Sequence, residues 1–227
     1  MKENKNIQLL GQLEQHTGKV YLGTEVDYET SEFPANFIRE FFENEIKDED
    51  GKTELSQTTN STRLRFLPEL DSVRAEKILR KIQTQSHLPK TISDLAKVIG
   101  LAHSVRIWGL NDAIVGGFED DYYFDTFFED DYRITCAEDV HDYLIGRNAP
   151  DWIADELTEY ISIMGWKGNL NEELVSCGCE EWFINVIERV RRLMSRAECY
   201  QRAIETKRLI FYLTRYPAIY AAVYDRV

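Results

Sequence analysis

The sequence lacks the features that mark several large classes of protein. No stretch approaches the roughly 20 apolar residues that span a bilayer, and the opening MKENKNIQLLGQ contains no apolar run of the secretory kind. The 4 cysteines are too few to form a disulfide framework that stabilises a chain of 227 residues. These absences predict a soluble, cytoplasmic protein whose thiols are reduced.

Recognised catalytic motifs are missing as well. The chain has neither the GxxxxGKS/T loop nor the GxGxxG turn that cradle phosphates, and its 4 histidines lie in no known catalytic signature. Cys136 and His141, with the thiols of Cys177-Gly178-Cys179, offer a Cys₃His set for zinc, but the one-residue gap is shorter than zinc modules use. The sequence therefore favours binding over catalysis and predicts no metal and no cofactor.

Carboxylates dominate what is present, and they are unevenly distributed. The 40 Asp and Glu against 27 Lys and Arg give a net charge of −13, on a chain whose 43% hydrophobic content still supports a core. Residues 107–181 carry 3 basic against 19 acidic side chains, and residues 1–60 carry 6 against 13. Residues 61–106 and 182–227 each carry 9 against 4. The chain is therefore built from two acidic and two basic segments.

Periodicity and turn residues predict an α+β protein in two portions. Residues 1–110 are expected to form a mixed N-terminal portion with short strands and helices, and residues 111–227 a mainly helical C-terminal portion that opens with an acidic, aromatic hairpin. The strands are predicted at GKVYLGTEV (18–26) and TRLRFL (62–67), with a hairpin near 104–118. The helices of the first portion are predicted at 34–46, 73–83 and 92–100, the last capped by Thr91 or Ser93.

The segment FEDDYYFDTFFEDDY, residues 118–132, places seven carboxylates among seven aromatic rings. Three interpretations are open. A Ca²⁺ or Mg²⁺ site would use the carboxylates as hard ligands, although the spacing is not that of an EF-hand. A solvated hairpin would turn its rings inward and its acids to water. A partner-binding surface would present charge at a density comparable with DNA, about one charge per 1.7 Å, with the rings as anchors.

Acidic side chains continue into the next predicted helix, where Asp151, Asp155 and Glu159 fall on one face at intervals of four residues. We expect these acids and the repeat to bind a basic, nucleic-acid-binding protein and to inhibit or regulate it, as a nucleic-acid mimic with an anti-defence role would. The predicted partner-binding residues are Glu119, Asp120, Asp121, Tyr122, Asp125, Glu129, Asp130, Asp131, Tyr132, Asp151, Asp155 and Glu159.

A second hypothesis rests on TISDLAKVIGLAHSVRIWG, residues 91–109. This stretch resembles the helix-turn-helix motif of DNA-binding regulators, with Ala96 as the small residue, Gly100 as the turn glycine and Leu101 after it, and it departs from the motif at Arg106. The resemblance implies a DNA-binding regulator whose acidic half serves dimerisation or autoinhibition, and direct binding of nucleic acid is the alternative to a protein partner. The DNA-contacting residues would be Lys81, Lys90, Lys97, His103 and Arg106.

Overall fold

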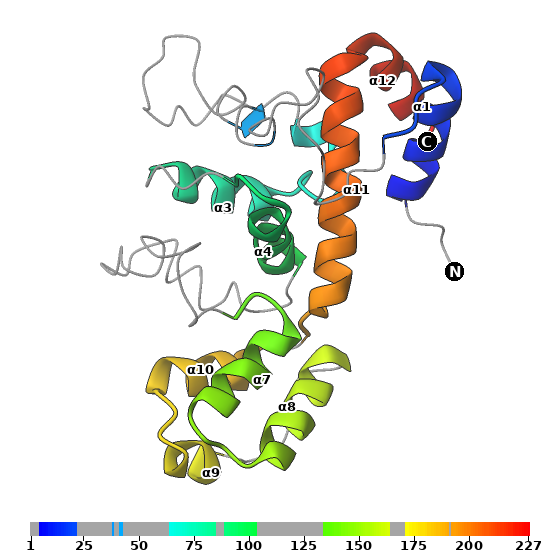
Figure 1. The fold of residues 1–227 in the computed structure, drawn as a ribbon. Coiled ribbons are helices and arrows are strands. Elements are labelled where there is room, and N and C mark those ends of the chain that lie inside the picture. The colour runs from blue at the N-terminus through cyan, green and yellow to red at the C-terminus, as the bar shows by residue number, and fades with distance from the viewer. Residues whose placement is uncertain are drawn as a thin grey trace. The chain divides into compact units, whose positions relative to one another are not determined.

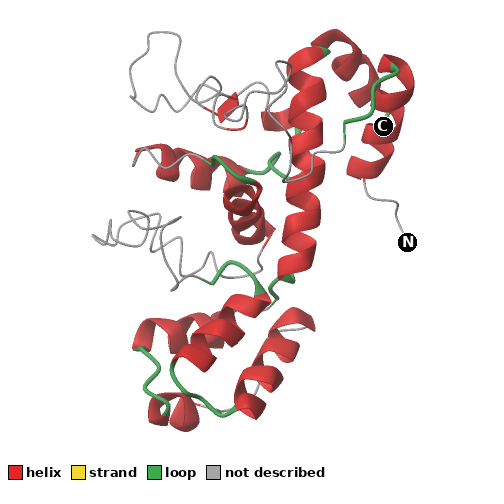
Figure 2. Cartoon of the chain, viewed as in Figure 1, coloured by secondary structure: helices red, strands yellow, loops and turns green. Residues whose placement is uncertain are grey.

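The structure, a computed structural model, describes residues 5–21, 38, 41–42, 64–84, 89–103, 134–163, 171–190 and 192–227. These residues are 75% helical and 1% strand and form no sheet, and only helices and loops are coloured in Figure 2. The predicted α+β class is therefore wrong, because this part of the chain is helical. No described helix is both long enough and apolar enough to cross a membrane.

The predicted strand at 62–67 shows why the α+β prediction failed. Leu64–Phe66 form a short 3₁₀ helix, η1, which continues in turns: the N–H of Leu67 donates to the carbonyl of Leu64 at 2.9 Å, and that of Leu70 to Leu67 at 2.8 Å. All three leucines are buried. Their spacing of three is the period of a 3₁₀ helix, whereas a strand buries every second residue. Residues 18–21 form a bend and loop, and the predicted hairpin near 104–118 lies outside the described residues.

The helices belong to two compact units. The first comprises Met1–Ala96 and Tyr200–Val227, and the second comprises Lys97–Cys199. The first contains α1 (Lys5–Thr17), η1, α3 (Val73–Thr84) and α12 (Pro217–Tyr224), and the second contains α7 (Ala137–Gly146), α8 (Asp151–Ile163), α9 (Asn171–Ser176) and α10 (Glu181–Arg189). The chain passes from one unit to the other within α4 (Ile92–His103) and α11 (Arg196–Arg215) (Figure 1). The predicted boundary at residue 110 lies outside the described residues and stays a prediction.

A buried polar cluster ties α11 to the rest of the first unit. The side-chain amide of Asn6, on α1, donates to Glu69 at 2.9 Å and to Glu205, on α11, at 3.1 Å. The guanidinium of Arg202 binds the same Glu69 at 2.9 Å. Carboxylates removed from water are stable only when hydrogen-bonded or paired, so these contacts fix where α1 and the turn after η1 meet α11.

Packing of α7 against α8 forms part of the second unit. The turn between the two helices is closed by Asn148, whose φ of 57° lies in the left-handed region. The N–H of Asn148 donates to Ile145 at 2.9 Å, and the N–H of Ala149 donates to Leu144 at 3.0 Å. These are the two hydrogen bonds of a Schellman motif, which ends a helix sharply. The short connection makes α7 and α8 neighbours.

Helix α4 begins as its sequence predicts and ends later. The N–H of Asp94 donates to the Thr91 hydroxyl at 3.1 Å, and the carboxylate of Asp94 accepts from the N–H of Thr91 at 2.9 Å. Thr91 is therefore the N-cap. The helix runs through Gly100 to His103. A Cβ at Gly100 would lie 2.4 Å from the carbonyl oxygen of Thr135, so the glycine permits this close approach of the two backbones.

We predict opposite effects for alanine at two helical glycines. Gly100→Ala should lower the free energy of unfolding by about 1–3 kcal/mol, because the new methyl group overpacks the contact with Thr135. Gly11→Ala should raise it by about 0.5–1 kcal/mol, because Gly11 lies within α1 with nothing within 4 Å of its Cβ position. Urea unfolding followed by circular dichroism measures both. Equal effects of the two substitutions would contradict the packing at Gly100.

Candidate functional site

Most of the predicted partner-binding residues lie outside the described residues, so their assignment stays a prediction. They are Glu119, Asp120, Asp121, Tyr122, Asp125, Glu129, Asp130, Asp131 and Tyr132. Arg106 of the alternative DNA-contacting set also lies outside them. Lys81 belongs to α3, but its side chain is not described.

The remaining predicted acids lie on the solvent side of α8. Asp151, Asp155 and Glu159 are all exposed, and they follow one another at one-turn spacing along the helix, as predicted. Trp152 is 55% exposed on the same helix. The buried residues of α8 are Ile153, Ala154, Leu157 and Ile161. The apolar side of α8 thus packs inside the unit, and the acids face water.

His141 of α7 reaches carboxylates on both helices. Its Nε2 lies 3.4 Å from Oδ1 of Asp155, on α8, and its Nδ1 lies 3.9 Å from Oδ1 of Asp142, on α7. Asp155 is therefore engaged within the chain, and of the three predicted acids on α8 it is the one with a described partner from another helix.

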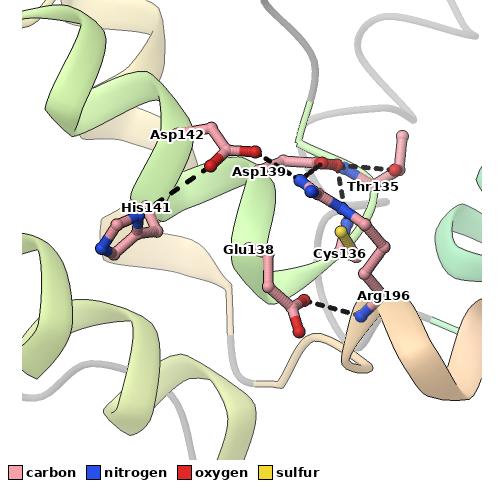
Figure 3. A network of polar contacts seen from close by, with 7 residues as sticks. All are labelled: Thr135, Cys136, Glu138, Asp139, His141, Asp142 and Arg196. Atoms are coloured by element: carbon pink, nitrogen blue, oxygen red, sulfur yellow. Dashed lines mark hydrogen bonds and ion pairs between the residues drawn. The ribbon is translucent and has the colours of Figure 1, made fainter.

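A denser network of polar contacts surrounds the first turn of α7 (Figure 3). Oδ2 of Asp139 accepts hydrogen bonds from the N–H of Thr135 at 2.7 Å, from the Thr135 hydroxyl at 2.7 Å and from the N–H of Cys136 at 3.0 Å. A carboxylate in this position binds N–H groups that the helix leaves without partners and lies at the positive end of the helix dipole. Asp139 therefore fixes the start of α7.

Arg196, the first residue of α11, completes this network. Its guanidinium bonds to Oδ1 of Asp139 at 3.1 Å and to the carboxylate of Asp142. Its own N–H donates to Oε2 of Glu138 at 2.6 Å. Figure 3 shows the Arg196 side chain between these carboxylates. Three acids of α7 are thus bound by one residue of the same chain, and the N-terminus of α11 already holds an anionic group.

Burial, hydrogen bonds and neighbouring charges set the protonation states of Arg196 and Cys136 in this network. Burial lowers the pKa of Arg196, but hydrogen bonds to Asp142 and contact with Cys136 outweigh it and leave the pKa above its ordinary value. Burial, and then the charge of Asp139, raise the pKa of the Cys136 thiol well above its usual range. Arg196 therefore stays charged and Cys136 stays a neutral thiol, so the network supplies fixed charge and no reactive thiolate.

The zinc set considered from the sequence is not assembled in the described residues. Within them no group of three or more His, Cys, Asp or Glu side chains could hold a metal ion. Gly178, with φ at 73°, forms with Cys177 and Cys179 the turn that ends α9. Burial and the neighbouring Cys177 raise the pKa of Cys179 to about 11.

The helix-turn-helix interpretation is wrong at its turn. The motif needs a chain reversal at Gly100, but α4 is helical on both sides of that residue and continues to His103. Lys90 is exposed just before the helix, whereas Lys97 and His103 are half-buried in it. Lys90, Lys97 and His103 therefore do not lie on a recognition helix of the expected kind.

Sequence reasoning missed the roles of Glu138, Asp139 and Arg196. The helix starts do carry local signals, since Asp139 lies four residues after Thr135, and Ser195 with Glu198 matches the capping-box spacing. The N–H of Glu198 indeed donates to the Ser195 hydroxyl at 3.1 Å. The pairing of Arg196 with Asp139 joins residues 57 positions apart, and no local sequence pattern predicts it.

Comparison with known proteins finds similarity to DNA polymerase III of the PolC type. The chain is 26% identical over 138 residues to the polymerase of Mycoplasmopsis pulmonis, 24% over 140 residues to that of Halalkalibacterium halodurans and 23% over 137 residues to that of Thermotoga maritima. These matches cover 60–61% of this chain and 9–10% of each polymerase. The matched part thus spans about a tenth of the length of these relatives. No family model matches the chain, and no solved structure does so either.

These comparisons contradict the predicted function. The similar proteins are replication polymerases, so the predicted acidic inhibitor, nucleic-acid mimic and anti-defence protein is not supported, and neither is the DNA-binding regulator. Any continuous stretch that covers three fifths of the chain must contain the middle fifth of the chain. The matched region therefore includes α4 and the acidic repeat. In addition, Asp139 and Asp142 of the acidic segment 107–181 are bound by Arg196 within the chain and are therefore engaged without an external partner. What the comparisons do support is a nucleic-acid-related context.

We predict that Asp139→Ala lowers the free energy of unfolding by about 1–3 kcal/mol, because it removes the cap of α7 and leaves the Thr135 and Cys136 amides without their acceptor. Glu156→Ala, at an exposed acid of α8, is the control and should change it by less than about 0.5 kcal/mol. Chemical unfolding of the two variants beside the parent provides the comparison. If the two substitutions cost the same, the network at Asp139 does not hold the helix start.

Proposed function

We propose that this chain acts in DNA replication by binding DNA, as a helical module similar to part of a PolC-type DNA polymerase III. The observation that carries the proposal is the recurrence of matches 137–140 residues long in polymerases from different genera. That length exceeds the longest continuous stretch in either unit. The similarity therefore involves residues of both units and not a single short motif.

The distribution of charge is compatible with DNA binding despite the net charge of −13. Charges in water act over a Debye length of about 8 Å at physiological salt, so a phosphate responds to its immediate surroundings. Several carboxylates are paired with arginines within the chain, since Arg196 binds both Asp139 and Asp142 and Arg202 binds Glu69. Local cations, not the sum over the chain, then decide where DNA binds.

The proposal extends to DNA binding and not to DNA synthesis. A match to a tenth of a polymerase supports one part of its work. The ligand in this proposal is DNA and not the basic, nucleic-acid-binding protein predicted from the sequence, and the acids of the repeat and of α8 have no role in it.

Fluorescence anisotropy with three labelled DNAs tests the proposed function: a primer–template, its single-stranded template and a blunt duplex of equal length. We expect saturable binding to the primer–template that weakens steeply between about 50 and 200 mM salt, because bound counterions are released from the phosphates. Unlabelled DNA should compete, and an uncharged polymer of similar size should not. Absence of binding to all three DNAs at the lower salt concentration would overturn the proposal.

A further inference from the structure

Cations and aromatic rings gather in the first unit where α1, η1 and α12 meet. Two tyrosines of α12 fasten η1, because the hydroxyl of Tyr224 donates to the carbonyl of Arg65 at 2.9 Å and that of Tyr220 donates to Phe66 at 2.6 Å. The rings of Phe66 and Tyr224 meet edge to face, with centroids 5.1 Å apart. We call Lys5, Arg65, Phe66 and Tyr224 the cation–ring cluster.

Each of these two rings carries a cation on its face. Nζ of Lys5 lies 4.3 Å from the centroid of Tyr224, and Cζ of Arg65 lies 4.9 Å from the centroid of Phe66. Both distances lie within the range of cation–π attraction. The rings thereby hold the two charged groups at one place, although Lys5 and Arg65 are 60 positions apart in the sequence.

Contact with a ring leaves the charge of each cation available. Lys5 and Arg65 are both exposed, and within the described part of the chain neither forms an ion pair. Arg202 and Arg208 of the same unit differ, because Glu69 and Glu14 bind them. A ring satisfies no N–H group, so the donors of Lys5 and Arg65 remain open to an anionic ligand.

Two acids limit the strength of this patch. Burial, and then the charges of Asp71 and Asp225, raise the pKa of Tyr224, whereas the charge of Arg65 lowers it, so both acids act at the cluster. Both acids are exposed. A ligand that brings many phosphates to the surface would also be repelled by these two acids. A ligand that brings one or two phosphates would interact mainly with Lys5 and Arg65.

We propose that the cation–ring cluster binds single-stranded DNA, with Lys5 and Arg65 on backbone phosphates and an unstacked base against the guanidinium plane of Arg65. Aromatic rings beside cations are the usual elements of single-strand binding, because they combine stacking with contact to the backbone. In a duplex the bases are stacked on one another, so no base face reaches the guanidinium. The inference rests on the proposed binding of DNA and assigns that binding a site and a strand form.

The test uses labelled oligo-dT and the full chain. Lys5→Ala/Arg65→Ala should weaken binding about tenfold, and the slope of log K against log salt should become shallower by about 1.4, since each single-strand phosphate contact contributes about 0.7. Lys19→Ala/Arg215→Ala removes the same two charges from exposed positions elsewhere in the unit. This control should weaken binding less than about twofold. Circular dichroism confirms that each variant is folded.

Two further variants separate charge from stacking. Arg65→Lys keeps the charge and loses the planar group, so it should weaken binding to oligo-dT by about threefold or more while the salt slope stays at the parent value. Asp71→Asn removes an opposing charge and should strengthen binding. Because both substitutions are conservative and exposed, they remain informative if the double alanine variant fails to fold.

Each outcome bears on one proposal. If the parent binds DNA and the double variant binds equally well, the site is overturned and the proposed function stands. If the parent binds no DNA, the proposed function is overturned, and the proposed site is overturned with it. If blunt duplex binds as tightly as oligo-dT and loses affinity equally in the double variant, the cluster is a duplex phosphate site and the single-strand assignment is overturned.

Discussion

Pairing of carboxylates with the arginines of a single helix, α11, is the constraint on which both units depend. Arg196 binds Asp139 and Asp142 in the second unit, and Arg202 binds Glu69 in the first. Such a pair adds little net stability, because both charges must leave water, but losing one partner leaves the other uncompensated and is costly. The pairs therefore matter chiefly by specifying where distant segments meet α11 within each unit.

This pairing changes the meaning of the charge pattern. Residues 107–181 look like a bare acidic field and residues 182–227 like a basic one. In the structure the second segment supplies Arg196 to the acids of the first. An arginine far along the sequence thus binds two of the acids that a block count leaves for an external partner. The inhibitor hypothesis treated each block as independent, and the fold couples them.

Local features were predictable and long-range ones were not. The 3.6-residue period and the Thr91 cap located α3 and the start of α4, because both signals lie within a few residues of the feature. LRFL was misread since its alternation resembles a strand, while only Leu64, Leu67 and Leu70 together reveal the period of three. The candidate site was harder still. Arg196 pairs with Asp139 across 57 positions, and no nearby residue encodes that contact.

In a chain with more acids than bases, the partner of each cation decides what it is free to do. A carboxylate such as Glu69 neutralises Arg202 and withdraws it from ligands. A ring such as Phe66 attracts Arg65 by only about 0.5–1 kcal/mol at an exposed site and leaves its charge in place. A phosphate forms charge-assisted hydrogen bonds, which are roughly twice as strong as neutral ones, and it can do so without removing the ring. A ring contact alone does not keep a cation available, since Arg147 lies over the ring of Tyr143 and is also bound to Glu180. Lys5 and Arg65 stand out because each lies on a ring and has no described carboxylate partner.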